Sequence, residues 1–121
     1  MDYVCWVTGC VNMGLSLMFQ SIGYHSKSID AVGKDSMIRA TSVHQLASLG
    51  FILLSMKGAP VLPTVTLAIA TSLFPFALYF QVLKKQRTML SRFIPMGGGL
   101  HMAFWLMMGV FYFNSATPKV E

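Results

Sequence analysis

Residues 93–118 read FIPMGGGLHMAFWLMMGVFYFNSATP and contain no Asp, Glu, Lys or Arg. The hydrocarbon core of a bilayer, about 30 Å thick, is crossed by a helix of about 20 mostly apolar residues. Residues 93–113 fit this length, and Pro95 suits a first helical turn, where its missing N–H is no loss. The stretch therefore predicts a membrane-spanning helix rather than part of a water-soluble domain.

The composition of the whole chain points the same way. Charged residues make up 11 % of its 121 residues and apolar residues 55 %, whereas soluble globular domains contain about 25 % charged residues. So few charges cannot coat a soluble particle of this size. The net charge of +5 lies in short segments between apolar runs, without a basic face or an RNA-binding motif. Nucleic acid is therefore not an expected partner.

Three further apolar runs complete the predicted fold, an all-α, four-helix transmembrane bundle with short loops in one membrane domain. The spans are expected at residues 3–23, 40–56, 62–83 and 93–113. The polar segment between the first two spans, residues 24–39, is interpreted as a loop that has room for a short interfacial helix. Pro75 should break the third span, and Thr71 and Ser72 are placed to compensate for the backbone groups that it frees.

Basic residues are unevenly divided between the two ends of such a bundle. Seven lie in the first and third loops, and two lie on the side of the termini. The seven are Lys27, Lys34, Arg39, Lys84, Lys85, Arg87 and Arg92, and the two are Lys57 and Lys119. Because basic loops remain on the cytoplasmic side, or the matrix side in a mitochondrion, both termini should face the opposite side.

The densest group of basic residues is also a candidate lipid site. It consists of Lys84, Lys85, Arg87 and Arg92. Each basic residue near an anionic leaflet contributes about 1 kcal/mol to membrane binding. An anionic lipid such as cardiolipin is therefore the candidate ligand here, although a purely topological role of the charges is the more favoured interpretation.

Small residues indicate where helices could approach closely in a membrane. The candidate packing residues are Cys10, Gly14, Gly97, Gly98, Gly99 and Ala103. Cys10 and Gly14 share one face of the first span, as Gly99 and Ala103 do in the fourth, because residues four apart lie on one side of a helix. The first span is therefore expected to pack among partner helices.

Few polar residues inside the spans offer chemistry. Asn12 needs a hydrogen-bond partner at membrane depth, and contact with a neighbouring helix is the first interpretation. His25, His44 and His101 could meet near the basic side, where two of them could ligate haem, but no motif fixes such a geometry. No nucleophile is visibly paired with a base. We therefore expect no catalytic residue, no metal site and no bound cofactor.

Four short motifs, in this order, resemble a known family. They are GYH at residues 23–25, HQLASL at 44–49, FPFALYFQVL at 74–83, and PMGG at 95–98 followed by Trp105. Within residues 9–113 the chain resembles the family of small membrane proteins of unknown function that includes transmembrane protein 256. Ser26 stands where that family commonly has Gly, and His101 lies outside its pattern. The resemblance implies four helices in a bacterial inner membrane or in a mitochondrion, and it supplies no reaction.

The predicted function is that of a non-catalytic accessory subunit of a larger inner-membrane assembly, with a mitochondrial respiratory-chain complex as the first choice. Spans rich in Met and Phe and poor in Ala favour the mitochondrial inner membrane, with basic loops in the matrix and termini in the intermembrane space. Other membrane subunits and an anionic lipid are the expected partners. The alternatives are a bacterial inner membrane for the location, and a small transporter or channel, or less favoured a haem-binding protein, for the function.

Overall fold

The computed structural model describes residues 2–85 and 89–111, without the side chains of residues 89, 90 and 111. The described residues form helices and no strand, so the predicted all-α class is confirmed. The elements are α1 (Tyr3–His25), α2 (Ala31–Met56), α3 (Val61–Thr71), the π-helical turn η1 (Ser72–Phe76), α4 (Ala77–Lys84), the 3-10 helix η2 (Met89–Phe93) and α5 (Ile94–Phe111). α3, η1 and α4 run into one another as a single helix, so four long helices result.

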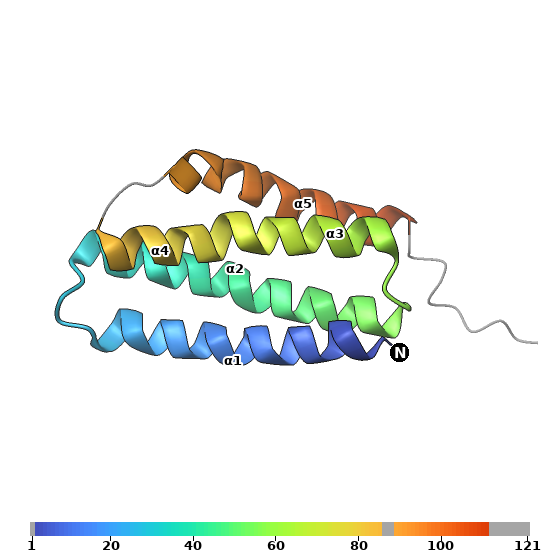
Figure 1. Ribbon diagram of the computed structural model, residues 1–121, viewed down its shortest axis with the longest axis horizontal. Coiled ribbons are helices and arrows are strands. Elements are labelled where there is room, and N and C mark those ends of the chain that lie inside the picture. The colour runs from blue at the N-terminus through green and yellow to red at the C-terminus, as the bar shows by residue number, and fades with distance from the viewer. Residues whose placement is uncertain (1, 86–88, 112–121) are drawn as a thin grey trace, which may run out of the picture.

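The four long helices run alternately up and down in chain order (Figure 1). α1 packs along α2, and α5 packs along α3 and η1. α2 joins the two pairs through its contacts with α3, η1 and α4. α1 and α5 therefore lie on opposite sides of the molecule, each with a face turned away from the rest of the chain.

α2 begins earlier than the sequence analysis predicted. It starts at Ala31, because the carboxylate of Asp30 caps it by accepting a hydrogen bond of 2.7 Å from the Gly33 N–H. One turn further on, Asp35 and Arg39 form an ion pair of 2.9 Å at helical spacing. The first loop therefore covers residues 26–30 rather than 24–39, and the expected interfacial helix is instead the first part of α2.

The predicted break at Pro75 takes the form of the π-helical turn η1. Proline has no N–H to donate, and a π turn is a common way for a helix to absorb such a position. Thr71 donates its hydroxyl to the Leu67 carbonyl at 2.8 Å, and Ser72 donates to the Ala68 carbonyl at 3.0 Å. Both hydroxyls are therefore satisfied within the helix, which continues to Lys84 without interruption.

The outward face of α2 carries large apolar side chains, and its buried stripe includes several polar ones. Its buried stripe recurs every three or four residues. The polar members of this stripe are Thr41, His44, Ser48 and Ser55, and the apolar members are Met37, Ala40, Ala47, Phe51 and Leu54. Its outward face carries Leu46 at 51 %, Leu49 at 47 % and Met56 at 64 % exposure. Water would favour polar side chains on the outward face. The pattern therefore indicates that hydrocarbon meets the outward face of α2.

Three helices are long and apolar enough to cross a membrane, namely Ala31–Met56, Val61–Lys84 and Ser91–Val110. α1 has a similar length, but Asn12 and Gln20 interrupt its apolar run. The fold and its outward surface thus define the protein as a helical membrane protein.

The interior contains two apolar clusters at different heights of the bundle. One consists of Cys5, Ala47, Phe51, Leu54, Leu67 and Phe104. The other consists of Met37, Ala40 and Tyr79, with Phe19, Ile22, Phe76, Leu78 and Val82 packed against it. Along α2, His44 lies between the members of the two clusters. A polar residue therefore occupies the middle of the core.

Candidate functional site

The buried polar centre of the molecule joins three helices through His44. This side chain is fully buried on α2, at 0 % exposure. Its Nε2 lies 2.7 Å from the Asn12 Oδ1 on α1, and its Nδ1 lies 3.0 Å from the Tyr79 Oη on α4. We call these three residues the His44 triad.

The protons of the His44 triad can be placed from its hydrogen bonds. Asn12 donates its side-chain N–H to the Thr8 carbonyl of its own helix at 2.8 Å, so its oxygen is the atom that faces His44. An amide oxygen can only accept, so His44 Nε2 carries the proton and donates. Nδ1 then accepts from the Tyr79 hydroxyl. Each ring nitrogen of a neutral imidazole is therefore paired, as a buried group in a membrane requires.

Aromatic rings surround the His44 triad. The rings of Phe19 and Tyr79 stack with centroids 4.1 Å apart, and the Phe76 ring meets the imidazole edge-on at 4.9 Å. This arrangement fixes the phenol and the imidazole relative to each other. The geometry favours a role in holding α1, α2 and α4 together over a role in catalysis.

The helix contact predicted for Asn12 is confirmed by its bond to His44. Sequence reasoning did not find Tyr79, although a phenol in the middle of an apolar span needs a partner for its hydroxyl. The transporter alternative expected a polar cavity reached by Asn12, His44 and His101. Asn12 and His44 instead bond to each other directly, and His101, a neighbour of His44, faces a mainly apolar groove.

The haem alternative required two histidines with free nitrogens on facing helices. Both nitrogens of His44 are engaged, and His25 is exposed at the end of α1. Across residues 2–85 and 89–111, no group of three or more His, Cys, Asp or Glu comes together in a way that could hold a metal ion.

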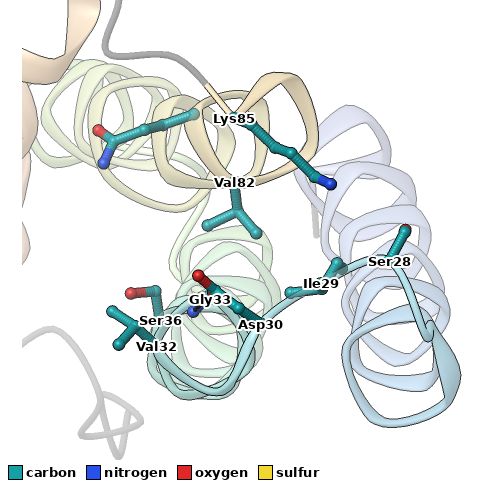
Figure 2. A pocket seen from close by; sticks show the side chains of 9 residues that line it. Ser28, Ile29, Asp30, Val32, Gly33, Ser36, Val82 and Lys85 are labelled. Carbon is teal, nitrogen blue, oxygen red and sulfur yellow. Dashed lines mark hydrogen bonds between the residues drawn. The ribbon is translucent and has the colours of Figure 1, made fainter.

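A pocket of about 340 Å³ lies at the end of the bundle that carries most of the basic residues (Figure 2). It is formed by the first loop, the first turns of α2 and the end of α4. Its lining residues are Ser28, Ile29, Asp30, Val32, Gly33, Ser36, Gln81, Val82 and Lys85. In Figure 2 the Lys85 side chain extends over the side of the pocket that Ile29 and Ser28 form. We call this the Lys85 pocket.

Three of the four basic residues predicted to bind lipid lie within the described structure. Lys85 ends α4 and lines the Lys85 pocket, whereas the Lys84 ammonium lies 5.6 Å from the centre of the Phe80 ring. Arg92 is exposed in η2, and Arg87 lies outside the described residues. Among the described candidates, Lys85 is therefore the one that lines this pocket.

α1 approaches α2 closely at Gly9, whereas the predicted packing residues Cys10 and Gly14 lie on another face of α1. A Cβ atom on Gly9 would lie 2.8 Å from the Ser48 carbonyl oxygen and 2.8 Å from the Ile52 Cγ1. Cys10 and Gly14 are both exposed, and a Cβ on Gly14 would meet nothing within 4 Å. Their face of α1 is turned away from α2.

The small residues of α5 are divided between its two faces. Gly97 contacts η1 so closely that a Cβ would lie 2.7 Å from the Phe74 backbone nitrogen. Gly98 lies beside the Phe74 ring, at 3.7 Å from a Cβ built there. Gly99 and Ala103 are exposed on the opposite face. Gly97 therefore packs within the chain, whereas Gly99 and Ala103 are available to something outside it.

A groove of about 470 Å³ separates α5 from α2, with η1 at its base. Its lining is apolar apart from one imidazole: Val43, Leu46, Phe74, Gly98, His101, Met102, Trp105 and Leu106. His101 is only 6 % exposed, and within the described residues neither of its ring nitrogens has a hydrogen-bond partner. The Ala70 carbonyl is a polar neighbour of the ring, but it is not in hydrogen-bonding geometry. We call this the His101 groove.

Comparison of the chain with protein-family models, with curated proteins and with solved structures gives no match. The resemblance to the family of transmembrane protein 256 therefore stays a prediction from the motifs. The features on which a function can be argued are the His44 triad, the Lys85 pocket, the His101 groove and the outward faces of α1 and α5.

Proposed function

We propose that this protein is a four-span membrane protein that serves as a non-catalytic accessory subunit of a larger inner-membrane assembly. Three of its helices have the required length and apolarity. α1 is proposed as the fourth span because its outward side chains are apolar too, including Val11 at 54 % and Met18 at 48 % exposure. Its half-buried polar residue Asn12 is satisfied by His44.

The main support is the outward face of α5. In the most apolar 18-residue window of the span Ser91–Val110, only 17 % of the residues are buried, against 50 % in the corresponding window of Ala31–Met56. Gly99 and Ala103 lie on the exposed face, where their small side chains would let another helix approach closely. We place a neighbouring subunit against this face. Cys10 and Gly14, exposed on α1 at the opposite side of the molecule, offer a second such surface.

The interior supports a structural rather than a catalytic role. The polar groups of the His44 triad bond to one another, so none remains free to act on a substrate. A mitochondrial respiratory-chain complex is the first choice of assembly, because the resemblance implies a mitochondrial or bacterial inner membrane and the Met- and Phe-rich spans favour the former. In a bacterium, the same role would be filled in the inner membrane.

The proposed orientation follows from charge. In the sequence, seven basic residues fall in the segments predicted as the first and third loops, against two on the predicted side of the termini. The positive-inside rule then places the Lys85 pocket on the matrix or cytoplasmic side. Lys85 and the first loop, which line the same pocket, would there hold the headgroup of an anionic lipid such as cardiolipin.

Blue-native electrophoresis of membranes that contain the full chain tests the proposal. We expect the protein to migrate within a large complex, and to be released by the double change Gly99→Leu and Ala103→Leu, which fills the outward face of α5. Met102→Leu, a nearly volume-neutral change on the same helix, should leave migration unchanged. Migration of the wild-type chain only as a small free species would refute the proposal.

A further inference from the structure

The Lys85 pocket carries two opposite charges that do not pair with each other. The Lys85 ammonium comes from the end of α4, and the Asp30 carboxylate comes from the N-cap of α2. In Figure 2 the two residues belong to facing sides of the pocket, and Val82 points from α4 towards α2 between them. Within residues 2–85 and 89–111, the Lys85 ammonium has no ion-pair partner. A ligand of the pocket therefore meets a cation on one side and an anion on the other.

The positive side of the pocket suits a phosphate group. The Lys85 side chain extends over the part of the pocket that Ile29 and Ser28 form (Figure 2). The Ser28 hydroxyl lies 2.9 Å from the Ser26 hydroxyl. When Ser28 accepts this hydrogen bond, its own O–H can donate to a phosphate oxygen that lies beside the Lys85 ammonium. Lysine commonly binds phosphate as a point charge, so the phosphate of a lipid is expected on this side.

The negative side of the pocket disfavours a phosphate. One Asp30 carboxylate oxygen accepts a hydrogen bond of 2.7 Å from the Gly33 N–H. The carboxylate therefore already occupies the N-terminus of α2, which would otherwise attract an anion. Its other oxygen has no hydrogen-bond partner within the part of the chain that the structure describes, and an ionised carboxylate can only accept. This side of the pocket therefore favours a group that donates a hydrogen bond.

The size of the pocket matches a headgroup rather than a whole lipid. Its volume of about 340 Å³ lies near the lower end of the range of ligand sites, about 300–1,000 Å³. Val32, one of the apolar lining residues, is 76 % exposed. It offers an apolar surface over which acyl chains can pass from the pocket to the bilayer.

We propose that the Lys85 pocket selects an anionic phospholipid whose headgroup carries a hydroxyl, as a glycerol headgroup does. Lys85 binds the phosphodiester, and Asp30 accepts a hydrogen bond from the headgroup hydroxyl. This selectivity rests on the lipid-binding role already proposed for the pocket, and it adds the property that distinguishes one anionic lipid from another. Phosphatidylglycerol and cardiolipin both carry such a hydroxyl.

Two lipids of equal charge test this selectivity. Phosphatidylglycerol and phosphatidylpropanol have headgroups of the same length, and only the first carries hydroxyls. Each is titrated into the detergent-solubilised full-length protein and followed by native mass spectrometry. We expect phosphatidylglycerol to bind about threefold to tenfold more tightly, which is the effect of one net hydrogen bond. Because the two charges are equal, the general attraction of a basic protein for anionic lipids cancels in the ratio of the two dissociation constants.

Two variants assign the two sides of the pocket. Asp30→Ser keeps a residue that caps α2 well but removes the second carboxylate oxygen, so the ratio should fall to about one. Asp35→Ser is the matched control, because Asp35 pairs with Arg39 and does not line the pocket, and it should leave the ratio unchanged. Lys85→Gln should weaken the binding of both lipids.

Four results would overturn the proposal, and they separate it from the lipid site itself. Equal binding of the two lipids, with both weakened by Lys85→Gln, would refute the selectivity and leave the lipid site in place. Binding that is unaffected by Lys85→Gln would refute the lipid site as well. A ratio that survives Asp30→Ser would exclude Asp30 as the acceptor. Tighter binding of phosphatidylethanolamine than of phosphatidylglycerol would assign the negative side to an ammonium instead of a hydroxyl.

Discussion

The contact between α1 and α2 at Gly9 gives the sharpest prediction from this structure. Replacing Gly9 by Ala places a Cβ 2.8 Å from the Ser48 carbonyl oxygen and 3.2 Å from the Ile52 backbone nitrogen. Both are backbone atoms of α2, so the clash cannot be relieved by a side-chain rotation. α1 must move away, and overpacking of this kind costs about 1–3 kcal/mol.

Gly14→Ala is the matched control, because it makes the same chemical change on the same helix. A Cβ at Gly14 meets nothing within 4 Å. Replacing Gly by Ala in a helix is itself favourable by about 0.5–1 kcal/mol, and this gain is shared by both variants. The difference between them therefore isolates the clash. We expect Gly9→Ala to be less stable than Gly14→Ala by about 1–3 kcal/mol.

The difference in stability between the two variants can be measured by reversible unfolding in mixed micelles. Far-UV circular dichroism follows the loss of helix as the fraction of denaturing detergent is increased. The movement of α1 should also loosen the bond of 2.7 Å between Asn12 and His44, since Asn12 lies one turn beyond Gly9. Equal stability of the two variants, or a more stable Gly9→Ala, would show that the contact surface of α1 has been assigned to the wrong face.

Two further predictions concern the other sites. In a double-mutant cycle, His44→Leu and Tyr79→Phe should show a coupling of about 0.6–2 kcal/mol in unfolding free energy, which is the range for hydrogen bonds between membrane helices. Additive effects of the two changes would contradict the bond of 3.0 Å between these residues. Lys85→Gln should weaken binding of cardiolipin to the detergent-solubilised protein, titrated by native mass spectrometry, by about 1 kcal/mol for the basic residue lost. Lys84→Gln should have a smaller effect in the same titration, because its ammonium packs over Phe80. Equal losses would indicate that charge alone, and not the pocket, binds the lipid.

The start of α2 was predicted wrongly, although the interactions that set it are local in the sequence. The start of α2 at Ala31 is set by the Asp30 cap and the pairing of Asp35 with Arg39, which all lie within ten residues of sequence. The sequence analysis gave more weight to the polarity of residues 24–39, and so predicted a loop. A polar segment can be helical when its own side chains cap it and pair along one face.

The sequence by itself determined the helical membrane class, the position of the third and fourth long helices and the need of Asn12 for a partner. These properties depend on local length, apolarity and hydrogen-bonding capacity. It could not choose between Gly9 and Gly14, since both faces of α1 carry small residues, nor pair His44 with Tyr79, 35 positions away. Only the tertiary structure decided these contacts, because the distance between two helix faces depends on how all the helices pack together.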